Sequence, residues 1–553
     1  MLNQLFRKKP VQQALENDPE QAETHSLHKV LTTRDLTFFG IAAIIGAGSF
    51  SSMGEACFKG GPGVVFLFII CAVACGFTAL CYAEFASRVP ASGSAYTYAY
   101  VSFGELFAWI IGWALLMEYS IGNIYVAFSW SGYFTNLLEG VGLHLPEWLT
   151  TNYRSAHNMY NQNISSEGML AWMTAPRIAG LRIIFDLPAV VANILITALV
   201  YVGVKESRNA SNVMVMLKLA VIVLVIGVGA FYVDIENWTP FMPNGFTGVM
   251  GGVAAVFFAF IGFDAVSTLA EESKDPQRDL PKGMIYSLII CTVVYIALAL
   301  VLTGMVTYAQ LGVSDPLAEV FKIREVKWML YIVSLVAVVA MTSVLLVFQM
   351  GQPRIWMSMS RDGLMPKRFA SIHPKYKTPG FATIVTGLVV GIPLFFTDEK
   401  FVLDFTSIGT LFAFVLVCGG VLMLPPKQPG EGGKFKLPYV NSKFIFPAMV
   451  VVAAGLLLQF NPEFVSNTFI INSETAATNV PMLIFFLVCI LLAVFSFLKN
   501  FSLIPVLGVV SCCYLLTGMA LSNWIWFTIW LVIGVVIYFL YGFRKSKLAT
   551  NTN

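Results

Sequence analysis

The sequence predicts an all-α polytopic membrane protein with two inverted halves of five helices each and a four-helix tail. Three observations predict this fold class. Of the 553 residues, 57% are hydrophobic and 12% are charged, whereas soluble globular chains carry about 25% charged residues. The apolar residues form about fourteen segments, close to the roughly 20 residues that a helix needs to span a bilayer. The first and sixth segments are interrupted by glycine, at corresponding places in the two halves.

Hydrophobic runs set the expected spans, two of which, the ninth and eleventh, are short. The predicted spans are 36–56, 63–86, 105–133, 185–203, 211–233, 247–270, 283–307, 328–356, 381–397, 402–424, 443–460, 481–498, 502–521 and 523–543. They divide the chain into an N-terminal segment (1–35), a first half (36–233, with a long loop at 141–184), a second half (246–424), a linker rich in proline and glycine (425–442), a four-helix tail (443–543) and a C-terminal segment (544–553).

The distribution of basic residues predicts the orientation of the chain. If the N-terminus is cytoplasmic, fourteen spans place 24 of the 34 Lys and Arg residues on the inner side and eight in outer loops. Cytoplasmic loops carry an excess of Lys and Arg. We therefore expect both termini, and the linker at 425–442, on the cytoplasmic side of a plasma membrane.

Composition and motifs exclude several classes. The net charge of +3 gives no electrostatic footprint for nucleic acid. The nine cysteines lie in or beside apolar segments, so we expect no structural disulfide, no metal site and no cofactor. The chain has no nucleotide-binding P-loop and none of the common catalytic motifs. These observations argue against an ATP-driven pump and against an enzyme, and leave a coupled or facilitative carrier.

The break in the first span predicts a site for a carboxylate. Gly46, Ala47 and Gly48 interrupt the helix, and unsatisfied backbone at membrane depth is tolerated only where it lines a cavity or is buried in protein. The amides of Ala47, Gly48 and Ser49 would then present positive dipole ends to an amino acid carboxylate. The alternative is that these glycines only permit close helix packing.

The break in the sixth span, near Gly262, predicts the other side of the site. Carbonyl groups freed between Phe258 and Ile261, Ala259 among them, are expected to accept bonds from the ammonium group of an amino acid. Phe258 would stack over the substrate as a gate, although an aromatic side chain in a membrane helix is more often plain packing. Asp264 follows the break and is expected either in the cavity or as a cap of the rewound half-helix.

Two ionisable residues lie within predicted spans. Glu118 lies near the centre of the third span, where a carboxylate costs about 3 kcal/mol on insertion scales. It is either a substrate-site or proton-linked carboxylate, or a packing group satisfied by a neighbour. Lys218 lies some six residues inside the fifth span, about 9 Å at the helical rise of 1.5 Å. It either extends to the membrane interface or faces inward, where gaining and losing a proton would couple transport to a proton gradient.

Two charged turns are expected at the cytoplasmic side. One begins at Glu271 and Glu272, and the other contains Arg361, Asp362 and Gly363. The interpretation favoured by the sequence is a pair of solvated loops. Ion pairs with Arg88 or Arg354 that act as gates are the alternative.

The motifs resemble those of a known family. They are Gly40–Gly48, Tyr82–Ala86 with Pro90–Tyr96, Gly112–Tyr119, Phe257–Glu272 and Arg361–Pro366. Together they resemble the amino acid–polyamine–organocation superfamily, and within it the cationic amino acid transporter subfamily and its bacterial relatives. The resemblance covers about residues 30–425 and implies the five-plus-five inverted-repeat fold of the leucine-transporter type. It departs from the family at Ser49, where a branched apolar residue is usual, so the pocket is expected to be more polar.

The resemblance also implies roles for individual residues. Ile44, Ala47 and Gly48 would line the carboxylate site, and Phe258 and Ile261 the ammonium side and gate. Glu118 matches a cavity carboxylate. Lys218 matches the lysine that occupies the sodium position of sodium-coupled relatives, which implies proton coupling.

Three hypotheses about function follow. The first is proton-coupled amino acid import by alternating access, with an amino acid, protons and the lipid bilayer as partners. The second is a uniporter or exchanger for cationic amino acids that protons do not drive. The third is a non-transporting amino acid sensor on a transporter scaffold. The sequence leaves open whether the substrate is cationic or small and neutral, and the tail is a candidate surface for a small accessory helix or a second copy of the chain.

Overall fold

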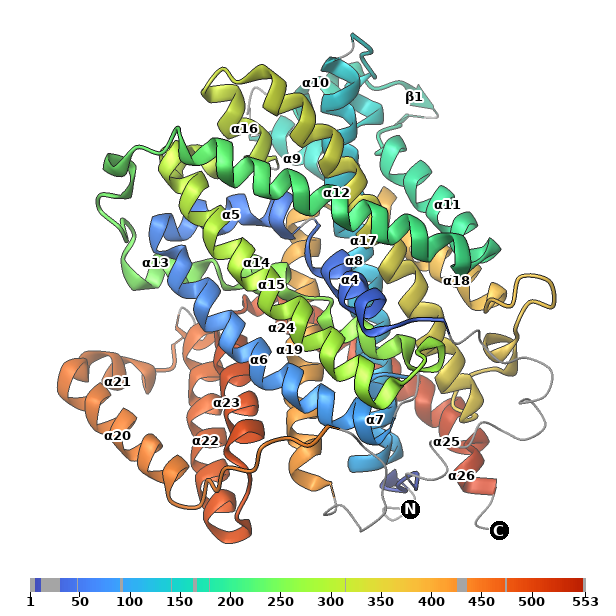
Figure 1. The fold of residues 1–553 in the computed structure, drawn as a ribbon, viewed down its shortest axis with the longest axis vertical. Coiled ribbons are helices and arrows are strands. Elements are labelled where there is room, and N and C mark those ends of the chain that lie inside the picture. Colours follow the sequence, from blue (N-terminus) through green and yellow to red (C-terminus); the bar gives the residue numbers. More distant parts are fainter. Residues whose placement is uncertain are drawn as a thin grey trace.

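The computed structural model describes residues 5–10, 30–46, 48–89, 93–140, 142–162, 167–178, 180–313, 315–424, 435–472 and 475–550. These residues form a bundle of helices around the two longest, α8 and α17 (Figure 1). At 36 residues, α8 extends about 54 Å at 1.5 Å per residue. That length exceeds the roughly 30 Å hydrocarbon core of a bilayer.

Short π and 3₁₀ turns carry the letter η. The first half contains α4 (Thr33–Ile44), η1 (Gly48–Ser52), α5 (Met53–Gly60), η2 (Gly61–Gly63), α6 (Val64–Arg88), α7 (Ala95–Ser102), α8 (Glu105–Gly140), η3 (Glu147–Leu149), α9 (Tyr153–Asn161), α10 (Glu167–Thr174), the hairpin β1 (Arg177–Ile178) and β2 (Leu181–Arg182), α11 (Leu187–Val202) and α12 (Val204–Ala230). The second half contains η4 (Ile235–Trp238), α13 (Gly245–Gly251), α14 (Val253–Phe260), η5 (Phe263–Glu272), α15 (Pro276–Met305), η6 (Tyr308–Leu311), α16 (Pro316–Ile323), α17 (Lys327–Arg361), η7 (Lys367–Ala370), α18 (Gly380–Gly391), η8 (Pro393–Phe395) and α19 (Glu399–Met423). The tail contains α20 (Ile445–Phe460), α21 (Pro462–Thr468), α22 (Ala476–Lys499), α23 (Leu503–Thr517), α24 (Leu521–Ile537), η9 (Tyr538–Gly542), α25 (Phe543–Lys545) and α26 (Lys547–Thr550).

Each predicted span contains a helix, but not all of these helices are long. Within the described residues, nine helices are long and apolar enough to cross a membrane, or up to ten if α20 and α21, which meet at a bend of 105°, form one span. Three further apolar helices, α11, α18 and α23, are shorter. The all-α polytopic class is confirmed. The inverted relation of the two halves stays a prediction.

The core lies where the first half meets the second. Helix α8 packs against α17 and α19, and α15 packs against both α4 and α6. The largest fully buried side chains include Trp109, Tyr119 and Tyr295. Burial of such aromatic side chains contributes strongly to packing, so the broken helices lie against a well-packed scaffold.

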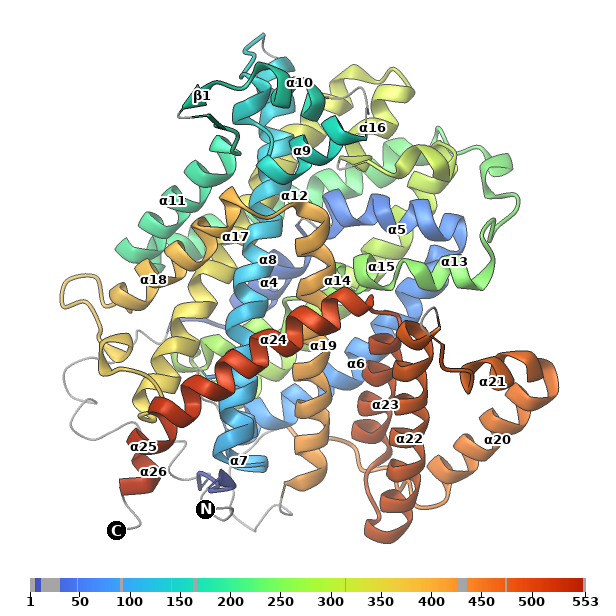
Figure 2. The ribbon, with the colours of Figure 1, turned by 180° about the vertical axis from the view of Figure 1, so that it is seen from behind.

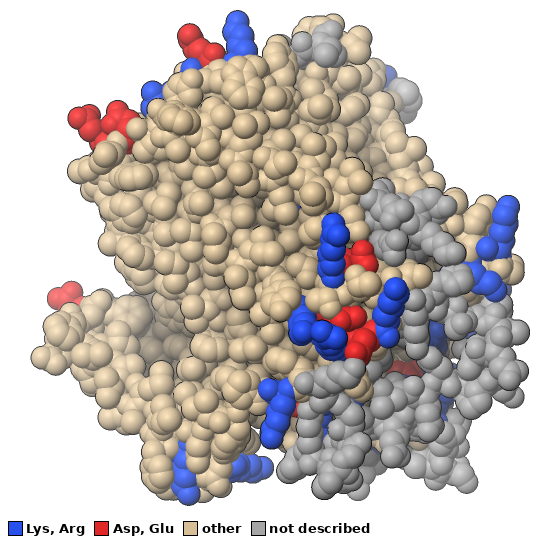
Figure 3. All heavy atoms as spheres, in the orientation of Figure 1, with Lys and Arg blue, Asp and Glu red and all other residues tan. Residues whose placement is uncertain are grey.

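The two ends of the bundle differ. We call the end that carries α9, α10 and the β1–β2 hairpin the loop end, and the opposite end, where both termini lie, the terminal end (Figures 1 and 2). On the face drawn in Figure 3, charged side chains lie near the loop end and toward the terminal end, and the surface between them is largely uncharged. Such a band fits the hydrocarbon region of a bilayer.

Both chain termini are fastened to the terminal end of the bundle. The carboxylate of Asp362 accepts hydrogen bonds from Lys9 Nζ (2.7 Å) and from the Tyr96 hydroxyl (2.8 Å). Its carbonyl accepts a hydrogen bond from the amide of Lys547 (3.1 Å). The side chain of Asp362 is only 14% exposed. The interpretation of this turn as a solvated loop is therefore wrong for Asp362, because the residue joins the two terminal segments to the end of α17.

The tail joins the core through α23, which packs against α19 and α6, and through α24, which packs against α19 and α8. In Figure 2, α24 crosses in front of α8 and α19, and the ring of Trp530 stacks on Trp113 of α8 with centroids 4.6 Å apart. Most of α20 is exposed. A partner for the tail, whether an accessory helix or a second copy, stays a prediction.

Candidate functional site

The helix of the first span ends at Ile44. Ile45 is extended, with φ −82° and ψ 100°, and the chain resumes as the π turn Gly48–Ser52. Ala47 lies outside the described residues. The amide of Ser49 donates to the carbonyl of Gly46 at 3.0 Å, and so does the hydroxyl of Ser49. The expectation that the Ser49 amide is free is wrong for this conformation, because the π turn already uses it.

The second broken helix has a different geometry. Helix α14 ends at Phe260, Ile261 is extended, and Gly262 has a φ of +118° before the ten-residue 3₁₀ segment η5. A side chain at Gly262 would be strained at this φ. Its ideal Cβ would also lie 2.6 Å from the Cβ of Ala43. The predicted interruption is therefore confirmed, and glycine is required there for conformation and for space.

The two breaks lie directly against each other. An ideal Cβ on Gly48 would lie 2.6 Å from the Cα of Ala259 and 3.0 Å from its Cβ. The hydroxyl of Ser52 donates to the carbonyl of Gly48 (3.0 Å) and to that of Ala255 in α14 (3.1 Å). The structure thus brings the expected carboxylate side and the expected ammonium side into contact. Close packing, which the sequence offered as an alternative to a site, is a property of the site itself.

Tyr295 of α15 contacts both breaks. Its hydroxyl lies 2.7 Å from the carbonyl oxygen of Ile44 and 2.9 Å from that of Ala259. One proton cannot be donated fully to both oxygens, so the hydroxyl holds two acceptors with one strong bond at a time. Nothing in the sequence pointed to this residue, because a tyrosine within an apolar span is most simply interpreted as a packing residue.

Lys218 faces the interior of the bundle. Its side chain is fully buried, and its ammonium donates to the carbonyl of Ala42 (3.0 Å), to the hydroxyl of Ser343 on α17 (3.0 Å) and to the carbonyl of Ile45. The alternative in which Lys218 extends to the membrane interface is wrong. The ammonium lies at the end of the first broken helix, and these three partners are uncharged oxygens.

The carboxylates of Glu118 and Asp264 are both buried, with residues 2% and 1% exposed. They interact electrostatically with each other. One oxygen of each, Glu118 Oε2 and Asp264 Oδ1, lacks a hydrogen-bond partner among the described residues. The N-cap of η5 is Gly262, and no side-chain hydrogen bond caps this segment, so the capping role of Asp264 stays a prediction. A buried polar atom without a partner is costly, so both free oxygens are candidates to meet water, a proton or a substrate group.

The loop side of the site is covered by aromatic side chains. The ring of Phe258 meets that of Tyr125 edge to face, with centroids 4.6 Å apart, and Phe258 is 5% exposed. The Tyr125 hydroxyl donates to Ser51 Oγ at 3.1 Å. Phe258 therefore lies where a gate would lie, and Tyr125 is a second residue of this cover that the sequence did not suggest.

The terminal side of the site is closed by an ion pair and by paired backbone. Arg354 Nε donates to Glu272 Oε1 at 3.0 Å, and both side chains are 4% exposed. The backbone of Leu31, just before α4, pairs with that of Ser273, just after η5. The interpretation of this turn as a solvated loop is wrong for Glu272. The ion pair with Arg354 is present and joins the end of η5 to α17, and the bridge between Leu31 and Ser273 joins the terminal ends of the two broken helices. A gating role for this ion pair stays a prediction.

Comparison with known proteins assigns the family. A model of amino acid permeases matches residues 31–492, and a model of the permease C-terminus matches residues 502–546. The chain is 38% identical to the branched-chain amino acid permease BcaP of Bacillus subtilis and 37% identical to the methylthioribose transporter of that organism, in each case covering 99% of this chain and 100% of the relative. It is 30% identical to a vacuolar cationic amino acid transporter of Arabidopsis thaliana, over 96% of this chain and 91% of that protein. With its paired broken helices and the family match along most of its length, the chain belongs to the amino acid permease family of the amino acid–polyamine–organocation superfamily.

Proposed function

We propose that this protein imports an amino acid together with protons across the plasma membrane, by alternating access at the two broken helices. The single observation that carries the proposal is the position of Lys218. Its ammonium is fully buried and bonded to Ala42, Ile45 and Ser343. A buried charge whose partners are neutral oxygens is costly, so losing the proton during the cycle is energetically accessible.

The number of N–H donors on Lys218 depends on its protonation, so this proton affects the contacts that hold the first broken helix. A charged ammonium offers three donors, which matches the three acceptors around Lys218. A neutral amine has two N–H groups and cannot serve all three. Loss of the proton would therefore release one of the contacts that hold the end of α4 against α17, and would favour movement of the first broken helix.

The substrate site proposed lies between the two breaks. The carboxylate of the amino acid would meet the backbone at Gly46 to Ser49, with Ile44 beside it. Its ammonium group would meet the carbonyls near Ala259 and Ile261, under Phe258. Binding would require the hydrogen bond between Ser49 and Gly46 to open, since helix N-terminal amides bind anions only when they are free.

We propose an apolar, neutral amino acid as the substrate class, because Ile44, Phe258 and Ile261 give the site apolar walls and because BcaP is named for branched-chain amino acids. The second candidate is a cationic amino acid. The observation that favours it is the pair of unpartnered oxygens on Glu118 and Asp264, which would suit a guanidinium or ammonium side chain.

Uptake into proteoliposomes tests both proposals. The purified protein is given labelled isoleucine, alanine, arginine or methylthioribose, with and without a proton gradient directed inward. The expected result is uptake of isoleucine that the gradient stimulates. In Lys218→Met the stimulation should disappear while exchange of substrate persists, and Lys322→Met, an exposed lysine paired with Glu319, serves as the matched control.

Other outcomes would contradict the proposal in distinct ways. Transport that ignores the gradient in both the wild type and Lys218→Met would favour a uniporter or exchanger. Uptake of arginine alone would favour the cationic substrate class. Binding without flux in sealed vesicles would favour a sensor that uses a transporter scaffold.

A further inference from the structure

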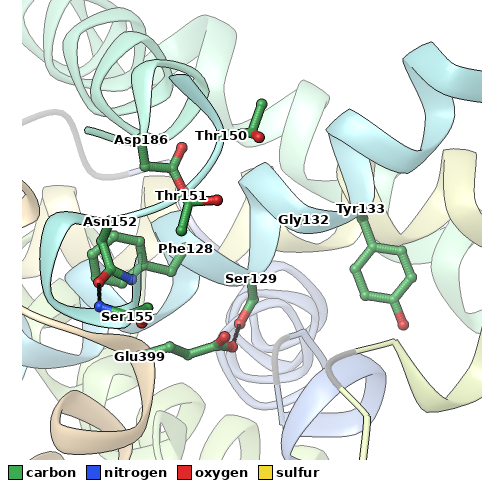
Figure 4. A pocket seen from close by; sticks show the side chains of 10 residues that line it. All are labelled: Phe128, Ser129, Gly132, Tyr133, Thr150, Thr151, Asn152, Ser155, Asp186 and Glu399. Atoms are coloured by element: carbon green, nitrogen blue, oxygen red, sulfur yellow. Dashed lines mark hydrogen bonds between the residues drawn. The ribbon is translucent and has the colours of Figure 1, made fainter. Parts of the chain in front are cut away.

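A cavity of about 160 Å³ lies at the loop end of the molecule, outside the site described above. It is lined by residues of α8, by the loop before α9 and the first turn of α9, by Asp186 just before α11, and by Glu399 at the start of α19 (Figure 4). Its lining includes two carboxylates, Asp186 and Glu399, together with Ser129, Asn152 and Thr151. A polar cavity of this size holds water, whereas an apolar one stays dry.

Glu399 connects this cavity to the first broken helix. It is the first residue of α19, ahead of the apolar stretch Phe405–Met423 that is long enough to span a membrane. One carboxylate oxygen, Oε1, accepts a hydrogen bond from Ser129 Oγ of α8 at 3.0 Å, and a longer one from Ser51 Oγ at 3.5 Å. Ser51 belongs to the π turn that follows the break. A single oxygen therefore joins α8, α19 and the π turn of the first span.

Ser51 also connects Glu399 to Phe258, the residue proposed as the gate, through Tyr125. Ser51 Oγ accepts a hydrogen bond from the Tyr125 hydroxyl at 3.1 Å, and the Tyr125 ring lies edge to face against Phe258. The hydroxyl of Tyr133 donates to the carbonyl of Phe50 at 2.6 Å, beside Ser51. The π turn is thus held to α8 at Phe50 and at Ser51, and Glu399 is the acidic member of this set that also faces the cavity.

We propose that Glu399 is a positioning residue that fastens the π turn Gly48–Ser52 to α8, and that release of this contact is part of opening the loop end to substrate. The proposal rests on the transport function proposed above. Because hydrogen bonds to an ionised acceptor are about twice as strong as neutral ones, the carboxylate form holds the contact and the protonated form weakens it. Protonation from the loop side would then favour the conformation that is open at that end.

The surrounding charges are compatible with this role. Burial raises the pKa of Glu399 to about 6, and the hydroxyls of Ser129 and Ser51 act in the opposite direction. The groups near it are Asp186 just before α11, Asp398 with its ion-pair partner Arg154, and Tyr125 and Tyr133 of α8. Glu55 of α5, which is paired with Lys59, acts on Tyr125. The nearby acid Asp398 raises the pKa of Glu399 further.

The test measures opening directly and does not depend on knowing the substrate. Ser407 lies eight residues after Glu399 on α19 and is fully buried, about 12 Å deeper at the helical rise of 1.5 Å. In Ser407→Cys, a membrane-impermeant maleimide added from the loop side labels the thiol only when that end opens. Labelling is followed in proteoliposomes at about pH 7.5 and about pH 5. These values lie above and below the pKa of Glu399, which is about 6. Protein without the reporter gives the background from the native cysteines.

The expected result is labelling that is about fivefold faster at the lower pH, as the charge-assisted bond is lost. Adding Glu399→Gln should give the fast rate at both pH values. Adding Ser51→Ala and Ser129→Ala, which keep the carboxylate but remove its donors, should do the same. The control Glu463→Gln, at an exposed acid of α21, should leave both rates unchanged.

Two results would overturn the proposal. One is a slow, pH-dependent rate that survives in Glu399→Gln, and the other is an unchanged rate in the serine variants. If the wild type transports none of the substrates, the transport proposal fails while the labelling still decides the role of Glu399. If it does transport, the KM measured from the loop side should fall in Glu399→Gln and lose its dependence on pH, without a matching change in the maximal rate.

Discussion

The ammonium of Lys218 donates a hydrogen bond to the carbonyl oxygen of Ala42 at 3.0 Å, across 176 positions of sequence. Ala42 lies in the last turn of α4, where a helix leaves carbonyl groups without partners inside the helix. A cation near a helix C-terminus is also stabilised by the helix dipole. The fifth span therefore supplies the cap that the broken first span lacks, and this is the physical basis of the proposed coupling.

Replacing Gly48 with alanine should impair the protein at the contact between the two breaks. The new Cβ would lie 2.6 Å from the backbone Cα of Ala259, which cannot move aside as a flexible side chain can. Overpacking of this kind costs about 1–3 kcal/mol, so we expect a lower melting temperature and loss of uptake. Gly76→Ala in α6, where the added carbon meets nothing within 4 Å, is the control; equal effects of the two changes would contradict this account.

Removing the hydroxyl of Tyr295 should loosen the join between the broken helices. In Tyr295→Phe the carbonyls of Ile44 and Ala259 lose their shared donor, and an unsatisfied buried acceptor costs about 1–3 kcal/mol. We expect weaker substrate binding by isothermal calorimetry, together with a lower melting temperature. Tyr286→Phe changes an exposed tyrosine on the same helix and should have no effect. Wild-type affinity in Tyr295→Phe would show that the hydroxyl does not support the site.

Breaking the ion pair at the terminal end should open that end. In Glu272→Gln the guanidinium of Arg354 stays buried without its counter-ion, which costs about 3–5 kcal/mol in measured cases. We expect faster labelling of a cysteine reporter from the terminal side and lower stability. The double variant Glu272→Gln with Arg354→Met should be less unstable than the sum of its parts, as expected for coupled residues.

The control for that ion pair is an exposed pair of the same chemistry. Lys322 and Glu319 interact at 3.2 Å with side chains 67% and 24% exposed, and such surface pairs contribute about 0–1 kcal/mol. Apart from a small change through the neighbouring carboxylate of Asp315, Glu319→Gln should therefore leave stability and labelling close to the wild-type values. An effect as large as that of Glu272→Gln would mean that burial does not decide the strength of these pairs.

Asp315, in the loop before α16, should make stability depend on pH. Burial, and next the nearby carboxylate of Glu319, raise its pKa to about 6, above the ordinary value of about 3.9. Ionisation is therefore harder in the folded protein, so its contribution is complete below about pH 4 and is lost as the pH rises to about 6. Asp315→Asn should flatten the plot of melting temperature against pH between about pH 4 and about pH 6. Glu463→Gln on exposed α21 should leave this plot unchanged. A wild-type melting temperature that does not fall between these pH values would contradict the prediction.

The sequence was informative at positions where a residue type occurs in only a few structural environments. Gly262 was predicted to break the sixth span, and the observed φ of +118° is a conformation that glycine adopts without strain. An ionisable residue in an apolar span is similarly restricted, which is why Lys218 and Glu118 could be identified before any fold was known. Tyr295, Tyr125 and Glu399 could not, since a tyrosine in an apolar segment, or a glutamate at the start of one, is common without any role in a site.

What the sequence by itself determined is the class of the protein. Hydropathy and charge depend only on composition along the chain, so they predicted an all-α membrane protein, the approximate positions of its apolar helices and two interruptions by glycine. The count of fourteen spans stays a prediction, since nine or ten of the described helices are long and apolar enough to cross a membrane. The tertiary structure alone decided which groups meet. Lys218 faces inward rather than toward the interface, Glu272 pairs with Arg354, and Asp362 holds both termini. The physical reason is that each outcome depends on the partner supplied by a distant segment, and periodicity along one helix carries no information about what packs against it.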